Sequence, residues 1–385
     1  MSVARFGGCV VWLSLGLMLL AACEGGAGGA PGGECVIARD CQDGDLCNGS
    51  EACDDGWCIG GEAPLSCVVA SGSACGGVCA DDERCEAGAC EAACLPPSVP
   101  VFSSVPVGAR FVLPPAVEVY VAAGGATTRP REPVALDAGH GLSFERPGRV
   151  LVEAFWKEST GCEASFRAFY DVVERVESAP EVAAISMDDP RLVAWAAGFV
   201  DVRWGSDLDP GWMDPTRALG AAIGTWDDAV SLGNGGAMTF VFEESVGDAE
   251  GPELAVFENG FSESFLELAF VEVSSNGVDF VRFPSLSLQT ADVGPYGTLD
   301  ASEVMGVAGR FRAGFGAAFD LAHLAQTPEV LTGRVELGAI RYVRLVDVVG
   351  DGTMGDSFGN PIYDPTPTIG PAGFDVEAVG VIRAR

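Results

Sequence analysis

The order of apolar and polar positions predicts a protein built of β-strands. Short runs rich in Val, Phe and Tyr recur from residue 110 to the C-terminus, and Gly or Pro separates them. Val117, Val119 and Val121 alternate with other residues, which is the period of two that a strand with one buried face requires. Asn276-Gly277 between two such runs predicts a hairpin closed by a two-residue type I′ turn. We therefore expect an all-β fold class.

The same pattern divides the chain into five parts. The predicted parts are residues 1–22, a signal peptide; 23–34, a Gly-rich tether; 35–94, a cysteine-rich region; 95–177, a small β-domain; and 178–385, a larger β-domain. A chain of 385 residues is long enough for several domains.

The N-terminal segment predicts export. Arg5 precedes an apolar run, residues 10–22, that is too short to span a membrane comfortably. The run ends in Leu20-Ala21-Ala22-Cys23, which resembles the lipobox of bacterial lipoproteins. The resemblance implies that Cys23 is acylated, that the lipid attaches the protein to a membrane, and that Glu24 directs it to the outer membrane or cell surface. The alternative is an ordinary signal peptide in which Cys23 is not acylated.

Besides Cys9 and Cys23, twelve of the fourteen cysteines remain, and we expect disulfides rather than zinc because an exported chain meets an oxidising compartment. These are Cys35, Cys41, Cys47, Cys53, Cys58, Cys67, Cys75, Cys79, Cys85, Cys90, Cys94 and Cys162. The first six resemble the cysteine-rich repeats of myxobacterial-type surface proteins. The next five leave one thiol over, so we predict a bridge from that group to Cys162. The sequence does not choose the other pairs.

Both β-domains resemble known families. PGRVLVEAFW and FRAFYDVV, within 95–177, resemble the last strands of a bacterial immunoglobulin-like domain. In the larger domain, SLGNGGAMTFVF, VEVSSNGVDF and RYVRL resemble the galactose-binding-like jelly roll of discoidin and coagulation-factor type C domains. They also resemble secreted bacterial proteins, some with PEP-CTERM tails. The resemblances imply disulfide-rich small modules, an immunoglobulin-like sandwich and a C-terminal jelly-roll β-sandwich, a fold that mostly binds glycans, lipids or proteins.

The net charge of the chain limits the classes of partner that it can bind. It is −33 at pH 7, and Lys157 is the single lysine. Such a chain repels phosphate, so nucleic acid is excluded as a partner. Acidity is compatible with cation binding, but it equally serves solubility.

Gly355-Asp356-Ser357-Phe358-Gly359 matches the G-x-S-x-G pattern of serine hydrolases, but its surroundings do not support catalysis. His140 and His323 are the only histidines, both precede the serine, and no helix-forming run follows it. A hydrolase elbow needs a strand, a turn and a helix, with histidine last in the order. We therefore predict no catalytic residues and no enzyme. A glycosidase that uses two carboxylates is the least favoured alternative.

The same segment is rich in oxygen ligands. Calcium takes six to eight oxygens from flexible segments, and residues two apart on a strand share a face. The predicted calcium ligands are Asp347, Asp351, Asp356, Asn360, Asp364, Asp375 and Glu377, with Glu258 and Asn259 as further contributors from a neighbouring strand end. The alternative is that these side chains only serve turn geometry.

Aromatic residues in 296–326 allow two interpretations. Tyr296, Phe311, Phe315 and Phe319 lie near arginines, as in a sugar platform, but the same pattern packs a loop onto a sheet, which we favour. The sequence as a whole predicts a non-enzymatic surface lipoprotein that binds an extracellular ligand, a polysaccharide, with calcium shaping the loops. A structural or adhesion protein acting through contacts with surface proteins is the alternative.

Overall fold

The computed structural model describes residues 99–102, 104–113, 118–123, 133–157, 163–225 and 228–383, and before them only the backbone of short strands. Those strands are β1 (Ala4–Phe6), β2 (Cys9–Val11), β3 (Ala21–Cys23), β4 (Ala52–Asp54), β5 (Trp57–Ile59), β6 (Glu83–Glu86) and β7 (Ala89–Ala92). The chain forms two compact units, Met1–Ala80 with Cys85–Glu91, and Asp81–Arg84 with Ala92–Arg385.

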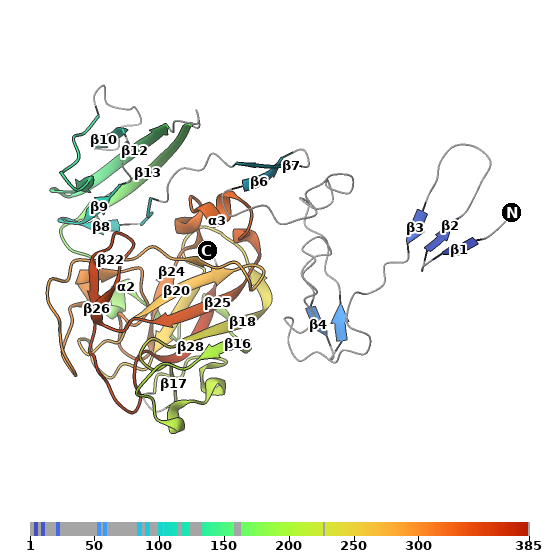
Figure 1. Cartoon of the computed structure of the whole chain (residues 1–385). Helices are drawn as coiled ribbons and strands as arrows, with labels where there is room; N and C mark the ends of the chain where they lie inside the picture. Colours follow the sequence, from blue (N-terminus) through green and yellow to red (C-terminus); the bar gives the residue numbers. More distant parts are fainter. Residues whose placement is uncertain are drawn as a thin grey trace. The chain divides into compact units, whose positions relative to one another are not determined.

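Two antiparallel sheets form the larger β-domain (Figure 1). One has the order β16 (Gly198–Arg203), β18 (Ala237–Val246), β25 (Ile340–Asp347), β20 (Ala269–Ser274) and β21 (Val281–Arg282). The other has the order β14 (Ile185–Ser186), β24 (Phe315–Phe319), β19 (Leu254–Glu258), β28 (Asp375–Ile382) and β15 (Leu192–Trp195), and β17 (Val230–Ser231) also pairs with β28.

The core lies between these sheets. Phe240, Val271 and Leu345 come from the first sheet, and Val256 and Val379 from the second, and all five are buried in one cluster. Such burial contributes about 1.5–3 kcal/mol for each large apolar side chain. The domain is thus a β-sandwich, and the predicted all-β class is confirmed.

The smaller β-structure has one main sheet of order β10 (Glu118–Ala123), β12 (Gly148–Lys157), β13 (Glu163–Val173) and β8 (Ser104–Pro106), with β8 parallel to β13. A separate pair, β9 (Arg110–Val112) and β11 (Gly141–Ser143), faces it. On β13, buried and exposed residues alternate, as the sequence pattern predicts.

The two β-structures share core residues. Leu286 and Met305 of the larger domain belong to the buried cluster of the smaller one. The ring of Phe358 stacks on Phe111, with 4.5 Å between centroids and an angle of 6°. Residues 178–385 produced alone would expose these three apolar side chains to water.

Two local predictions are corrected. The hairpin between β20 and β21 exists, but a six-residue loop closes it, because Ser274 and Asn276 accept N–H groups of the loop and only Gly277 has positive φ. A type I′ turn would need positive φ at both central residues. In addition, Phe315–Phe319 is strand β24, although 296–326 lacks strand alternation, because β19 covers one edge of it and β14 the other.

Every cysteine side chain lies outside the described residues, and so do the signal peptide and the tether. Acylation of Cys23 and all disulfide pairs, including that of Cys162, therefore stay predictions. No helix among the described residues combines the length and apolar character that crossing a membrane requires.

Candidate functional site

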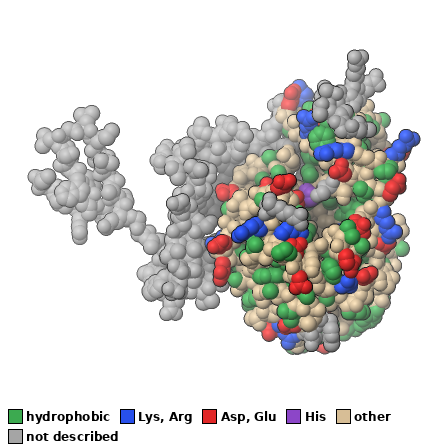
Figure 2. All heavy atoms as spheres, turned by 180° about the vertical axis from the view of Figure 1, so that it is seen from behind, with side chains coloured by type: hydrophobic (Ala, Val, Ile, Leu, Met, Phe, Trp, Pro, Cys, Tyr) green, Lys and Arg blue, Asp and Glu red, His purple; other side chains and the backbone are tan. Residues whose placement is uncertain are grey.

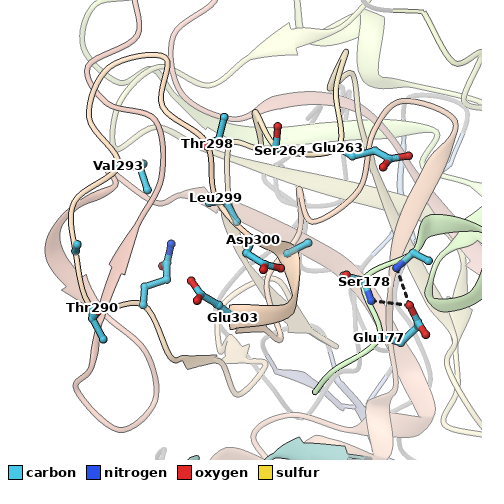
Figure 3. A pocket seen from close by; sticks show the side chains of 14 residues that line it. Glu177, Ser178, Glu263, Ser264, Thr290, Val293, Thr298, Leu299, Asp300 and Glu303 are labelled. Atoms are coloured by element: carbon cyan, nitrogen blue, oxygen red, sulfur yellow. Dashed lines mark hydrogen bonds between the residues drawn. The ribbon is translucent and has the colours of Figure 1, made fainter. Parts of the chain in front are cut away.

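A pocket of about 840 Å³ opens on loops of the larger domain and on the segment that leads into it (Figure 3). Such a volume is in the range of small-molecule sites. Its lining comprises Glu177, Ser178, Ala179, Glu263, Ser264, Gln289, Thr290, Ala291, Val293, Thr298, Leu299, Asp300, Ala301 and Glu303. Polar and acidic side chains predominate, and no Lys, Arg or His is among them.

Local hydrogen bonds fix the first loop, Phe261–Phe265. The Ser262 hydroxyl accepts the N–H groups of Ser264 (3.3 Å) and Phe265 (2.8 Å), a turn typical of serine. This turn brings Phe261 and Phe265 together, with 5.2 Å between ring centroids. Glu263 and Ser264, between them, line the pocket.

The second loop places Tyr296. Asp292 accepts the N–H of Gly294 at 2.7 Å, and the Gly297 N–H bonds the Gly294 carbonyl at 3.1 Å. A Cβ on Gly297 would collide with the Val293 carbonyl, so this turn requires glycine. Tyr296 itself has φ +54°, which is rare for a bulky residue and costs energy that the surrounding turn must offset.

The two loops join to form one aromatic wall. The N–H of Leu299 bonds the Ser264 carbonyl at 2.9 Å. Phe265 stacks on Tyr296 with 6.2 Å between centroids and 16° between planes, so the three rings form a ladder. The outer members remain in water, Phe261 75% exposed and Tyr296 65% exposed. Large rings exposed beside a pocket are typical of a binding surface.

Arginines neutralise some of the pocket's carboxylates. Arg175 forms an ion pair with Asp300, which also accepts the Ser302 N–H and hydroxyl. Burial raises the pKa of Asp300, but the bonds from Ser302 and Arg175 outweigh it and hold this pKa below its ordinary value. Arg312 pairs with Glu263 at 3.3 Å and with Glu181 at 2.7 Å.

Two other carboxylates of the pocket lining form no ion pair among the described residues. Glu177 accepts the N–H groups of Ser178 (3.0 Å) and Ala179 (2.8 Å), the dashed lines of Figure 3. Glu303 is exposed. Arg310 donates to the backbone carbonyl of Glu177 at 3.4 Å, but in the part of the chain that the structure describes neither carboxylate forms an ion pair with arginine or lysine. Elsewhere, on the face in Figure 2, acidic and basic side chains are interspersed with apolar ones.

The aromatic residues singled out in the sequence differ in their exposure to solvent. Phe311 and Phe319 are buried and Phe315 is half-buried under Arg312, so the packing interpretation is confirmed for the first two. Tyr296 is exposed, contrary to that interpretation. Its stacking partners were missed, although two phenylalanines four apart in a polar turn and the Gly-Pro-Tyr-Gly sequence are signals that could have found them.

Two of the predicted calcium ligands instead hold backbone N–H groups. Asp347 accepts Phe374 N–H at 2.6 Å through one oxygen and Gly235 N–H at 2.7 Å through the other. Burial raises the pKa of Asp347 to about 7, although these bonds oppose the shift. Asp356 accepts four donors, the N–H groups of Ser287, Phe358 and Asn360 and the Asn360 side-chain amide, at 2.8–2.9 Å.

Three further predicted ligands have different surroundings. Asp351 is exposed and accepts the N–H and hydroxyl of Thr353. Asn360 donates to Asp356, as described. Asp364 is buried and accepts the N–H of Leu268 at 2.8 Å, and burial, with the charge of Asp347, raises its pKa well above the ordinary value.

The last two meet the neighbouring strand end that the sequence suggested. Asp375 accepts a hydrogen bond from Ser231 and one from Asn259, and burial raises its pKa to about 7. Glu377 is 3% exposed; one oxygen accepts N–H groups of Ile223 and Gly224, and the other has no partner. Burial, and then the charge of Asp375, raises the pKa of Glu258 well above its ordinary value.

One calcium ion cannot be held by all seven. Oxygens around one ion at 2.3–2.6 Å lie within about 5 Å of each other. Among the described residues, the group of three acidic side chains whose oxygens all lie within 4.8 Å of one another is Asp248, Glu253 and Asp320, and none of these was predicted. Glu253 already accepts N–H groups of Ala249 and Leu321, each at 2.8 Å.

The structure brings Ser357 near His323, which the sequence order did not suggest. Both line a small pocket of about 230 Å³ with Arg282 and Gln326. The Ser357 hydroxyl, however, accepts the Ser285 N–H at 2.9 Å and lies between β26 (Asp351–Gly355) and β27 (Pro361–Tyr363), a two-stranded hairpin. The strand–turn–helix elbow of a serine hydrolase is therefore missing at this serine.

No protein family model and no curated protein matches this chain. Among solved structures, a secreted serine protease from Vibrio cholerae is 13% identical, with a TM-score of 0.18, over 71% of this chain and 44% of its own, so this chain spans less than half of that protein. A two-domain protein of unknown function from Bacteroides fragilis is 12% identical, with a TM-score of 0.22, over 69% and 80%. SGBP-B from a xyloglucan utilization locus in Bacteroides uniformis is 12% identical, with a TM-score of 0.18, over 86% and 84%. Likeness this distant assigns no activity, and the β-sandwich class rests on the two packed sheets themselves.

Proposed function

We propose that this protein is a non-enzymatic lipoprotein, attached to the outer membrane or cell surface through Cys23, that binds an extracellular polysaccharide. The binding site is the pocket together with the aromatic ladder of Phe261, Phe265 and Tyr296. The cysteine-rich region serves as a disulfide-linked spacer between the lipid and the β-domains.

The aromatic ladder beside the pocket carries this proposal. Sugar rings present apolar C–H faces and a rim of hydroxyls, so they need a flat apolar surface next to hydrogen-bonding groups. Phe261 and Tyr296 offer exposed rings, and Ser264 and Thr290 offer polar groups a short way along the same loops. The strained backbone at Tyr296 supports a functional reason for presenting that ring.

A polysaccharide array tests the proposal. The protein must retain both β-domains, because Leu286, Met305 and Phe358 pack into the smaller one. Aromatic contacts contribute about 0.5–1.5 kcal/mol each, so the double variant Phe261→Ala/Tyr296→Ala should bind its best glycan about five- to a hundredfold more weakly. Val278→Ala/Ile369→Ala, at exposed apolar positions outside the pocket lining, is the matched control and should bind like the parent.

Two outcomes would replace the proposal. An array with no signal, in a protein that still captures surface proteins through an apolar face, would favour the adhesion function. Release of reducing ends from a bound glycan would favour a glycosidase. For the latter, the lowered pKa of Asp300 is unfavourable, because a general acid of this class needs a raised pKa.

Calcium enters the proposal as a structural ion and takes no part in glycan binding. The supporting observation is the buried Glu377 oxygen without a hydrogen-bond partner, which lies close enough to Glu258 for the charge of Glu377 to act on the pKa of Glu258, as the charge of Asp375 does. Calcium should raise the midpoint of thermal unfolding relative to EDTA, and Asp375→Asn should reduce that shift. Equal midpoints in calcium and in EDTA would reject the proposed calcium ion. Glycan binding should be the same in both buffers.

A further inference from the structure

The charge of the pocket bears on which polysaccharide it accepts. Four of its lining residues are acidic and none is basic. Asp300 and Glu263 form ion pairs with arginines, whereas the carboxylates of Glu177 and Glu303 form none among the described residues. Arg310 donates only to the backbone carbonyls of Glu177 and Ala301, so two carboxylates of the lining are not paired with a cation, in a protein whose net charge is −33.

This charge discriminates between classes of glycan. A uronic-acid or sulfated polymer would bring further negative charge to Glu177 and Glu303, and like charges a few ångströms apart repel even near a surface. A neutral polymer would use the rings and the hydroxyl partners, but it would leave both carboxylates uncompensated. A polymer with ammonium groups would pair with them.

The aromatic ladder favours the same class. A cation over the face of Phe or Tyr is attracted by about 0.5–1 kcal/mol at an exposed site. Phe261 and Tyr296 present such faces on the two loops that also supply Glu263, Ser264, Val293 and Thr298 to the pocket. Rings and carboxylates together therefore recognise both the apolar face and the charge of an amino sugar.

We propose that the pocket selects a polysaccharide of hexosamine units with free, protonated amino groups, held by Glu177, Glu303 and the rings of Phe261 and Tyr296. This inference rests on the proposed glycan-binding function. The long-range attraction of an acidic protein speeds the encounter, and the two carboxylates supply the local selectivity.

The test compares oligomers of one backbone. Glucosamine oligomers, N-acetylglucosamine oligomers of the same length and polylysine of the same charge are titrated into the protein. We expect glucosamine oligomers to bind at least tenfold more tightly than the acetylated ones. The preference should decline with added salt, and also as pH rises and the amine loses its proton.

Matched variants locate the effect. Glu177→Gln/Glu303→Gln should abolish the preference for the glucosamine oligomer over the acetylated one. The first of these substitutions retains a side-chain oxygen that can accept the N–H groups of residues 178 and 179. Glu244→Gln/Glu250→Gln removes two exposed charges outside the pocket lining and should leave the preference intact.

The outcomes separate the two proposals. Equal affinity for free and acetylated oligomers would overturn the amino-sugar inference while glycan binding stands. Binding of polylysine as tight as that of glucosamine oligomers, insensitive to Phe261→Ala/Tyr296→Ala, would mean a non-selective acidic surface and would also overturn it. Absence of binding to either oligomer and to every other glycan would reject the proposed function itself.

Discussion

The acids of the pocket and the acids around β28 lie in the same domain but in opposite chemical situations. Asp347, Asp375 and Glu377 are buried and accept backbone or hydroxyl donors, so their oxygens hold loops against the sheet. Glu177 and Glu303 line an open pocket, and their carboxylates form no ion pair among the described residues. The residue type is the same, and the difference is where the fold directs each carboxylate oxygen.

The contrast explains why density of acidic residues was a poor guide to binding. The segment from Asp347 to Glu377 is rich in Asp and Glu, but most of these carboxylates accept hydrogen bonds from the protein's own N–H and hydroxyl groups. The pocket draws its acids from segments far apart in sequence, residues 177, 263, 300 and 303, and no single motif contains them.

The largest expected effect is a pH dependence that comes from the buried acids. Asp347 and Asp375 have pKa values of about 7 in the folded chain, against about 3.9 in an unfolded chain. Between about pH 4 and 7 the folded state therefore binds protons that the unfolded state has released. The free energy of unfolding should fall as pH rises through this window, by roughly 1.4 kcal/mol per pH unit for one fully linked carboxyl.

Urea unfolding in EDTA at several pH values measures that slope. Asp375→Asn should flatten it, whereas Asp351→Asn, whose pKa is lowered by bonds from Thr353, should leave it unchanged above pH 4. A free energy of unfolding that increases from pH 4 to 7 would show that these buried acids are ionised and stabilised by their hydrogen-bond donors. The buried acids and the acids of the pocket would then no longer differ in charge.

A smaller effect should follow from removing the carboxylate that closes the β26–β27 hairpin. Asp356→Ala leaves the N–H groups of Ser287, Phe358 and Asn360 without an acceptor. Each unsatisfied buried donor costs about 1–3 kcal/mol, but water will reach some of them, so we expect a loss of about 3 kcal/mol in the free energy of unfolding. The exposed Asp351→Ala should cost less than 1 kcal/mol, and a similar small loss for Asp356→Ala would contradict a structural role.

The smallest effect concerns the aromatic ladder. Asparagine adopts the left-handed backbone of residue 296 more readily than alanine, so Tyr296→Asn should be more stable than Tyr296→Ala by about 0.5–1 kcal/mol. Both variants lack the ring and should bind glycan equally weakly. If the two were equally stable, the strain at this position would be negligible, and the support it gives to a binding role would be lost.

How much of this could be predicted depends on the range of the interactions. The sequence predicted the strands β10, β12, β13, β18, β25 and β28, because alternation of apolar residues is a local property that one buried face imposes. It missed β24, whose Phe-Gly-Ala-Ala-Phe sequence has weak propensity and forms a strand only because β19 and β14 supply its hydrogen-bond partners. It proposed the hairpin at Asn276-Gly277 but not the loop, since Ser274 and Asn276 satisfy the N–H groups there through side chains.

The sequence by itself determined the all-β class, the acidic character from which we predict that nucleic acid is not a partner, and the pattern from which export and acylation at Cys23 are predicted. Tertiary structure decided which acids became internal hydrogen-bond acceptors and which stayed exposed in the pocket. It also decided that Phe261, Phe265 and Tyr296 form one ladder, because two loops separated by some thirty residues meet through the Leu299 to Ser264 bond. Burial and contacts of this kind depend on segments distant in the chain, and local composition carries no information about them.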